Sequence, residues 1–217
     1  MSQFITDILK RANETRFNYK DGVLEISPAV LVFRNFSGNP NHFGNTSKNF
    51  NVVIPHWPVD ESGLILTDFL QNSLVNRANE QLIPTIHKYP KDAAGTDDDP
   101  CFYYINIKVN MDTDYPPNIK LYTTNTRNGE KRISCTVLSD PKFQSTIGCL
   151  DKADLERADV QLNVRDSKAN PGRAVFYLRK LNAKQICIPD FGGAYDELDA
   201  QIEANPEIMA ANEEIMK

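Results

Sequence analysis

Short segments of β-forming residues, separated by polar loops, are the feature that most constrains the fold of this 217-residue chain. Glycine, proline and asparagine interrupt these segments, and apolar residues recur at helical spacing over a long internal stretch only at 63–77. Strand–helix alternation of the βαβ type is absent, which argues against a parallel nucleotide-binding sheet. We therefore expect a mainly β protein, a predominantly antiparallel sheet that closes into a β-barrel. The predicted strands are 23–36 (broken at Pro28), 48–54, 101–109, 118–124, 131–138, 159–165, 173–181 and a last one near 184–188.

Helices are also expected at both ends of the chain. Residues 2–16 place Phe4, Ile5 and Ile8 on one helical face, and Asn205-Pro206 is a favourable helix start in the C-terminal segment. The stretch 150–159 favours one or two helical turns before the strand at 159–165. The predicted fold is thus a β-barrel with one internal helix and helical terminal extensions.

Alternate side chains of a strand point to opposite faces of a sheet, so each predicted strand divides into two sets. In four strands one set pairs an aromatic ring with a cation. Rings that stack on bases and cations that neutralise phosphates are what a sequence-tolerant single-strand binder needs. One such pair is ordinary half-buried surface, whereas its recurrence indicates a binding face. These sets are Val32, Arg34 and Phe36; Phe102, Tyr104, Asn106 and Lys108; Asn118, Lys120, Tyr122 and Thr124; and Arg173, Val175, Tyr177 and Arg179.

Charge is distributed unevenly along the chain. Residues 190–217 contain eight acidic residues and one basic residue, a net charge of −7. The whole chain has 24 basic and 29 acidic residues, so residues 1–189 keep 23 and 21 and carry a net charge of +2. A near-neutral, locally basic body with an acidic tail is a layout in which the tail competes with a polyanion or docks other proteins, although a solvated terminal helix has the same composition.

The sequence offers no active site. His42, His56 and His87 are scattered without metal-ligand spacing, and no phosphate-binding or nucleophile motif occurs. We expect no catalytic residue, metal or cofactor. Four widely spaced cysteines, no secretion signal and no apolar run of roughly 18 to 20 residues indicate a reducing cytoplasm and no membrane.

Three stretches resemble a family of bacteriophage single-stranded DNA-binding proteins of the OB-fold type. They are LVFRNFSG at 31–38 with KNFNVVI at 48–54, PPNIKL at 116–121, and LDKADLERADVQLNVR at 150–165 followed by AVFYLRKL at 174–181. The resemblance covers 31–181 in patches, and an acidic C-terminal segment is also typical of the family. It implies an OB-fold-like barrel that coats and protects single-stranded DNA during replication or recombination in the cytoplasm of the infected bacterial host.

We accordingly predict an N-terminal extension at 1–22, an OB-like single-stranded DNA-binding domain at 23–189 and an acidic C-terminal tail at 190–217. The hairpin tip at 125–132, with a turn-forming Asn-Gly, supplies further cations. Expected partners are single-stranded DNA, duplex DNA more weakly, and phage or host replication proteins through the tail, with the protein a monomer or weak homo-oligomer. The predicted DNA-binding residues are Arg34, Phe36, Lys48, Tyr104, Lys108, Lys120, Tyr122, Arg127, Lys131, Arg132, Arg173, Tyr177 and Arg179.

Two alternatives stay open. A phage structural or protein-interaction module would bury the same barrel face against another subunit. A nuclease would need a carboxylate metal site, for which the sequence has no convincing candidate. The choice between DNA and RNA is also open, because phosphate contacts do not distinguish strands.

Overall fold

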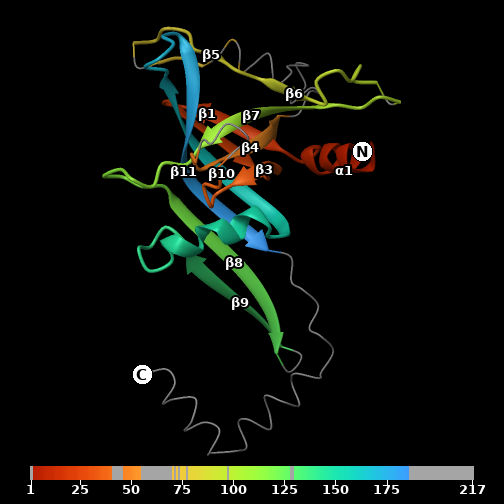
Figure 1. The fold of residues 1–217 in the computed structure, drawn as a ribbon, viewed down its shortest axis with the longest axis vertical. Coiled ribbons are helices and arrows are strands. Elements are labelled where there is room, and N and C mark those ends of the chain that lie inside the picture. Colours follow the sequence, from red (N-terminus) through yellow and green to blue (C-terminus); the bar gives the residue numbers. More distant parts are fainter. Residues whose placement is uncertain are drawn as a thin grey trace, which may run out of the picture.

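The protein is described from a computed structural model, which defines residues 2–40, 46–54, 70, 72, 74–76, 78–96, 98–127 and 130–185. Its strands form one 11-stranded sheet, accompanied by helix α1 and the 3-10 helix η1 (Figure 1). The elements are α1 Ser2–Ala12, β1 Arg16–Lys20, β2 Val23–Ser27, β3 Leu31–Asn35, β4 Asn49–Ile54, β5 Ile83–Pro84, β6 His87–Tyr89, β7 Phe102–Lys108, β8 Asn118–Arg127, β9 Glu130–Val137, η1 Gln144–Asp151, β10 Leu155–Asp166 and β11 Arg173–Gln185.

The sheet is mixed and open. Its main path runs β1-β2-β10-β11-β7-β4-β3, and the end strands β1 and β3 do not pair within the described chain. The 13-residue β11 is long enough to take two partners end to end, since each residue advances a strand by about 3.3 Å. It pairs in parallel with β7 at Phe176 and Tyr177 and with β8 from Lys180 to Lys184, so the sheet forks there (Figure 1). The predictions of a mainly β protein and of a predominantly antiparallel sheet are confirmed, since among the described strands only the pairs of β11 with β5, β7 and β8 are parallel. The prediction that the sheet closes into a barrel is wrong.

The main core lies on one face of this sheet, the inner face. Phe50, Ile107 and Phe176 lie in one row across β4, β7 and β11, and all three are buried. Each such side chain contributes about 1.5–3 kcal/mol through removal from water. Ile147 and Leu150 of η1 close the core from the opposite side.

Helix α1 covers part of the other face, the outer face. Its Ile5, Ile8 and Ala12 pack in a second buried cluster with Val53 and Phe102. The predicted N-terminal helix is therefore confirmed and ends at Ala12. Figure 1 shows α1 beside the β3–β4–β7 end of the sheet.

Other local predictions had mixed outcomes. β1 was not predicted; it forms a hairpin with β2 through Asp21-Gly22, whose φ angles of 52° and 76° suit a two-residue turn. The helical turns expected at 150–159 are wrong, because η1 ends at Asp151 and β10 begins at Leu155. The helix expected at 63–77 lies largely outside the described residues, although Leu70 and Leu74 belong to the main core. The tail at 190–217 lies wholly outside them.

Candidate nucleic-acid interface

The outer face carries a row of polar side chains across four strands. Strand register aligns Asn163, Tyr177, Lys108 and Asn49 from β10 to β4, and the apolar Val23 of β2 continues the row. Lys108 Nζ lies over the Tyr177 ring, 5.9 Å from its centroid. A cation held against an aromatic face offers a base-stacking surface and a phosphate contact at one place.

The outer face continues onto the β8–β9 hairpin. Lys120 pairs with Asn182 of β11, and Tyr122 pairs with Lys184. Tyr122 also faces Cys135 of β9, and a hydrogen bond to that thiol raises the pKa of the Tyr122 hydroxyl. A second ring and a second cation thus follow about 20 Å further along β11, at 3.3 Å per residue.

A bulge in β11 adds basic residues to this face. Leu178 pairs with Leu162 and Lys180 with Gln161, so Arg179 has no partner in β10. Because a bulge inserts one residue, Arg179 and Lys180 are both directed away from the core, between buried Leu178 and Leu181.

Acidic and basic side chains of this face differ in their pairing. Glu25 accepts a hydrogen bond from Gln161 Nε2 at 2.8 Å, and Asp159 pairs with Arg157 at 3.1 Å. Asp159 is thus neutralised by an ion pair, whereas Glu25 keeps its charge because glutamine is neutral. The face has an excess of positive charge because its unpaired cations outnumber such acids. Within the described residues, no hydrogen bond or ion pair involves the side chains of Lys20, Lys120, Arg165, Arg173, Arg179 and Lys180.

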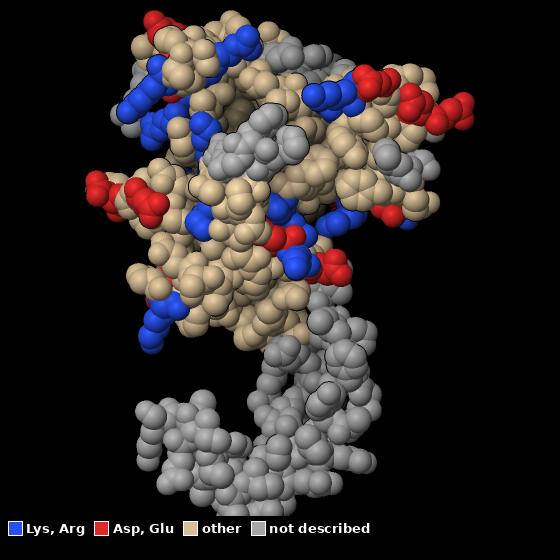
Figure 2. Space-filling model, viewed as in Figure 1, with Lys and Arg blue, Asp and Glu red and all other residues tan. Residues whose placement is uncertain are grey.

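A cavity of about 590 Å³ at the edge of this face is lined by Arg165 and Arg179 together with Asn76, Asn79 and Asn163. Among the described residues that line it, Asp21 is the one acid. Figure 2 shows Lys and Arg gathered at the upper left, where β10 leads into β11. This end of the outer face suits an anion.

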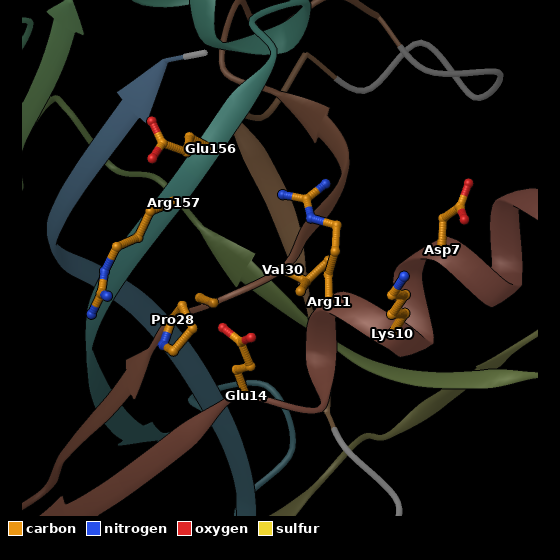
Figure 3. Close-up of a pocket in the computed structure, with 9 residues that line it drawn as sticks. Asp7, Lys10, Arg11, Glu14, Pro28, Val30, Glu156 and Arg157 are labelled. Atoms are coloured by element: carbon orange, nitrogen blue, oxygen red, sulfur yellow. The ribbon is translucent and has the colours of Figure 1, made fainter.

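A second cavity, of about 600 Å³, lies between α1, the β2–β3 connection and β10 (Figure 3). Its charged lining residues balance, so it has no preference for a polyanion. They are the acids Asp7, Glu14 and Glu156 and the bases Lys10, Arg11 and Arg157. Within the described residues, no group of three His, Cys, Asp or Glu side chains could hold a metal ion, and no helix is long and apolar enough to cross a bilayer.

The structure brings many of the predicted binding residues together on the outer face. In β7, β8 and β11, residues directed to the outer face alternate with buried residues, as the two predicted sets require. Phe102 and Thr124 are the exceptions, because both are buried. The residues on the outer face are Tyr104, Lys108, Lys120, Tyr122, Arg173, Tyr177 and Arg179.

Arg34 and Phe36 do not belong to this face. Phe33 adopts φ 47° within an irregularity between Val32 and Asn35, which reverses the alternation of β3. Phe36 is fully buried and stacks on Phe50 at 5.0 Å between ring centroids. Arg34 donates a hydrogen bond to the Ala153 carbonyl at 2.8 Å, and burial lowers the pKa of its guanidinium.

Lys48 has a structural contact of its own. Its Nζ donates to the carbonyls of Phe36 at 3.2 Å and Ser37 at 3.1 Å. Its ammonium therefore holds the chain that follows β3, and it is not one of the unpaired cations of the outer face.

The predicted hairpin at 125–132 is confirmed in its backbone pairing, in which Arg127 lies opposite Glu130. The side chains of Arg127, Lys131 and Arg132 lie outside the described residues. Their role in binding stays a prediction.

Sequence reasoning missed several outer-face residues. Lys180 and Lys184 were missed because the β11 bulge shifts the alternation after Arg179. Lys20 was missed with β1, although Asp21-Gly22 is a hairpin signal. Phe33 was placed opposite the predicted binding set and is 43% exposed.

No family model matches the sequence, and no curated protein does. Similar solved structures include three of the single-stranded DNA-binding protein from bacteriophage Enc34. A C-terminal truncation gives a TM-score of 0.39 at 10% identity, over 79% of this chain and 90% of that one. The protein without a stated truncation gives 0.36 at 11%, over 84% and 92%. Its complex with single-stranded DNA gives 0.34 at 12%, over 80% and 92%. With TM-scores below 0.5, the chain resembles these phage proteins distantly.

Proposed function

We propose that this chain is a non-enzymatic single-stranded DNA-binding protein and that DNA lies along the outer face. The observation that carries the proposal is the Tyr177–Lys108 pair, held at 5.9 Å in a row of polar side chains and surrounded by unpaired cations. Tyrosine rings stack on bases of any sequence, while Lys and Arg replace the counterions of the phosphates.

The finer setting of this function follows the sequence motifs. The protein coats and protects single-stranded DNA during phage replication or recombination in the cytoplasm of the infected host. The acidic segment 190–217 binds phage or host replication proteins. The charge contrast between −7 in this segment and +2 in the remainder supports that division of roles.

Salt-dependent titration of a labelled oligothymidylate tests the proposal. Tyr177→Ala should weaken binding by about 5- to 150-fold, because a stacked base contributes roughly 1–3 kcal/mol. Lys108→Ala should reduce the slope of log K against log salt by about 0.7, the value for one neutralised phosphate of a single strand.

Lys152→Ala is the matched control for Lys108→Ala. Lys152 is an exposed cation directly after η1, on the core side of the sheet. Its substitution should therefore leave both the affinity and the slope of log K against log salt unchanged. Binding that is insensitive to salt and equal in all three variants would refute the proposal. Duplex competitor measures the strand preference.

An assembly function is the second candidate, and the exposed apolar residues of β9 favour it. β9 pairs with β8 alone among the described strands, and its Ile133 is 67% exposed. An unpaired strand edge with apolar side chains is a template for pairing with another chain. Sedimentation of the free protein distinguishes the two candidates: assembly predicts a stable oligomer that an Ile133→Lys substitution dissociates.

A further inference from the structure

An aromatic cluster at the α1 end of the outer face is separate from the Tyr177–Lys108 pair. It consists of Phe33 (β3), His87 and Tyr89 (β6) and Tyr104 (β7). We infer that this cluster is a second base-stacking station for the same nucleic-acid strand, an inference that rests on the proposed function.

Among Phe33, Tyr89 and Tyr104, Phe33 is the most exposed residue. Its centroid lies 5.2 Å from Tyr89 and 5.5 Å from Tyr104, with edge-to-face angles of 65° and 67°. Phe102 stacks on the Phe33 ring at 6.1 Å and 27°, and 43% of Phe33 is left open to solvent. A φ of 47° is unusual for a bulky residue, and such strained positions cluster at functional sites.

The other rings hold the cluster in place. The rings of His87 and Tyr104 stack at 5.2 Å and 22°, and Phe102 lies buried beneath Phe33, Tyr89 and Tyr104. Aromatic pairs of this kind are rigid and lose little conformational freedom when a further ring stacks on them. Burial, with Tyr89 nearby, raises the pKa of Tyr104, so its hydroxyl stays neutral.

Continuity with the basic face identifies the occupant as nucleic acid. Tyr104, Asn106 and Lys108 are alternate residues of β7 and share its outer face, which leads directly to Tyr177. Asn106 donates to Asn51 at 3.0 Å, so the connecting surface is polar. A partner protein with an apolar surface would have to cross this polar surface to contact both the aromatic cluster and the Tyr177–Lys108 pair. An oligonucleotide fits better, because its bases can stack on the rings while its phosphates bind the cations.

The spacing predicts how far the station extends the binding site. Tyr104 and Lys108 are about 13 Å apart along β7, at 3.3 Å per residue. A strand stacked at about 3.4 Å per nucleotide, or extended to about twice that, covers this distance with roughly two to four nucleotides. The full binding site should therefore be roughly two to four nucleotides longer than the stretch of the outer face between Tyr177 and Tyr122.

Titration of full-length protein with oligothymidylates of increasing length tests the inference. Phe33→Gly removes the ring, and glycine accepts the positive φ, which offsets part of the packing lost with Phe102, Tyr89 and Tyr104. The melting temperature, measured in parallel, shows that the variant is folded under the titration conditions. We expect Phe33→Gly to weaken binding of long oligonucleotides by about 5- to 150-fold and to leave short ones unchanged, whereas Tyr177→Ala weakens all lengths.

Phe33→Trp provides a second readout that does not depend on a loss of affinity. The introduced indole should be quenched by long oligothymidylates, beyond the quenching of the single native tryptophan, and not by short ones. If Phe33→Gly binds every length like the wild type and the indole is not quenched at saturation, the station is refuted even though Tyr177→Ala weakens binding. If Tyr177→Ala also has no effect, the proposed function fails with it.

Discussion

Two phenylalanines three positions apart have opposite environments. Phe33 is exposed on the outer face, while Phe36 is fully buried against Phe50. The irregularity between Val32 and Asn35 separates their directions, so strict alternation assigns both residues incorrectly. Backbone conformation at this irregularity therefore decides which ring is exposed on the outer face and which packs in the core.

Phe36→Ala should lower the free energy of unfolding by about 3–5 kcal/mol, the range for large-to-small changes of a buried phenylalanine. The affinity of the folded protein for oligothymidylate should not change. Denaturant unfolding and a titration under folding conditions measure the two effects. Phe143→Ala, which removes a ring that is 41% exposed, serves as the control and should shift stability by less than about 0.5 kcal/mol. A stable Phe36→Ala protein with weakened DNA binding would contradict this assignment.

Among the elements, α1 and β11 have the largest consequences for the outer face. α1 covers the apolar patch around Val53 and Phe102, and thereby limits how much of the sheet is open. β11 serves as the common partner of β7 and β8, and its bulge directs Arg179 and Lys180 outward together. The candidate site is therefore a property of pairing between distant strands.

Two substitutions within α1, one buried and one exposed, test how the helix packs on the sheet. Ile8 is buried in the second cluster, so Ile8→Ala should cost about 2–5 kcal/mol of unfolding free energy. Phe4 lies on the same helix but is 50% exposed, and Phe4→Ala should cost less than about 0.5 kcal/mol. Equal effects of the two substitutions in chemical denaturation would mean that α1 does not pack as described.

For the whole molecule, the distribution of charge matters more than the net charge. The net charge of −5 would repel a polyanion, yet residues 1–189 carry +2, and six unpaired cations of the described chain lie on the outer face. The proposed binding of DNA at that face would depend on the local electrostatic potential, which salt screens over about 10 Å at 0.1 M.

Deletion of residues 190–217 should therefore tighten oligothymidylate binding at low salt, because it removes a net charge of −7. The difference between the truncated and full-length proteins should shrink toward 1 M salt, where the screening length is about 3 Å. Parallel titrations of both proteins at several salt concentrations measure it. Identical affinities at every salt concentration would show that the acidic segment does not compete with DNA.

Sequence patterns alone were enough to predict the β class and the strands that carry alternating apolar residues. They also identified five outward residues correctly: Tyr104, Lys108, Lys120, Tyr122 and Tyr177. These follow from local rules, since a period of two places apolar side chains on the core face wherever a strand is regular. Tertiary structure decided whether the sheet closes, which strands adjoin β11, and where the bulges at Phe33 and Arg179 reverse the alternation. Pairing between strands far apart in the chain and bulge positions depend on the fit of the whole sheet, so no single segment encodes them.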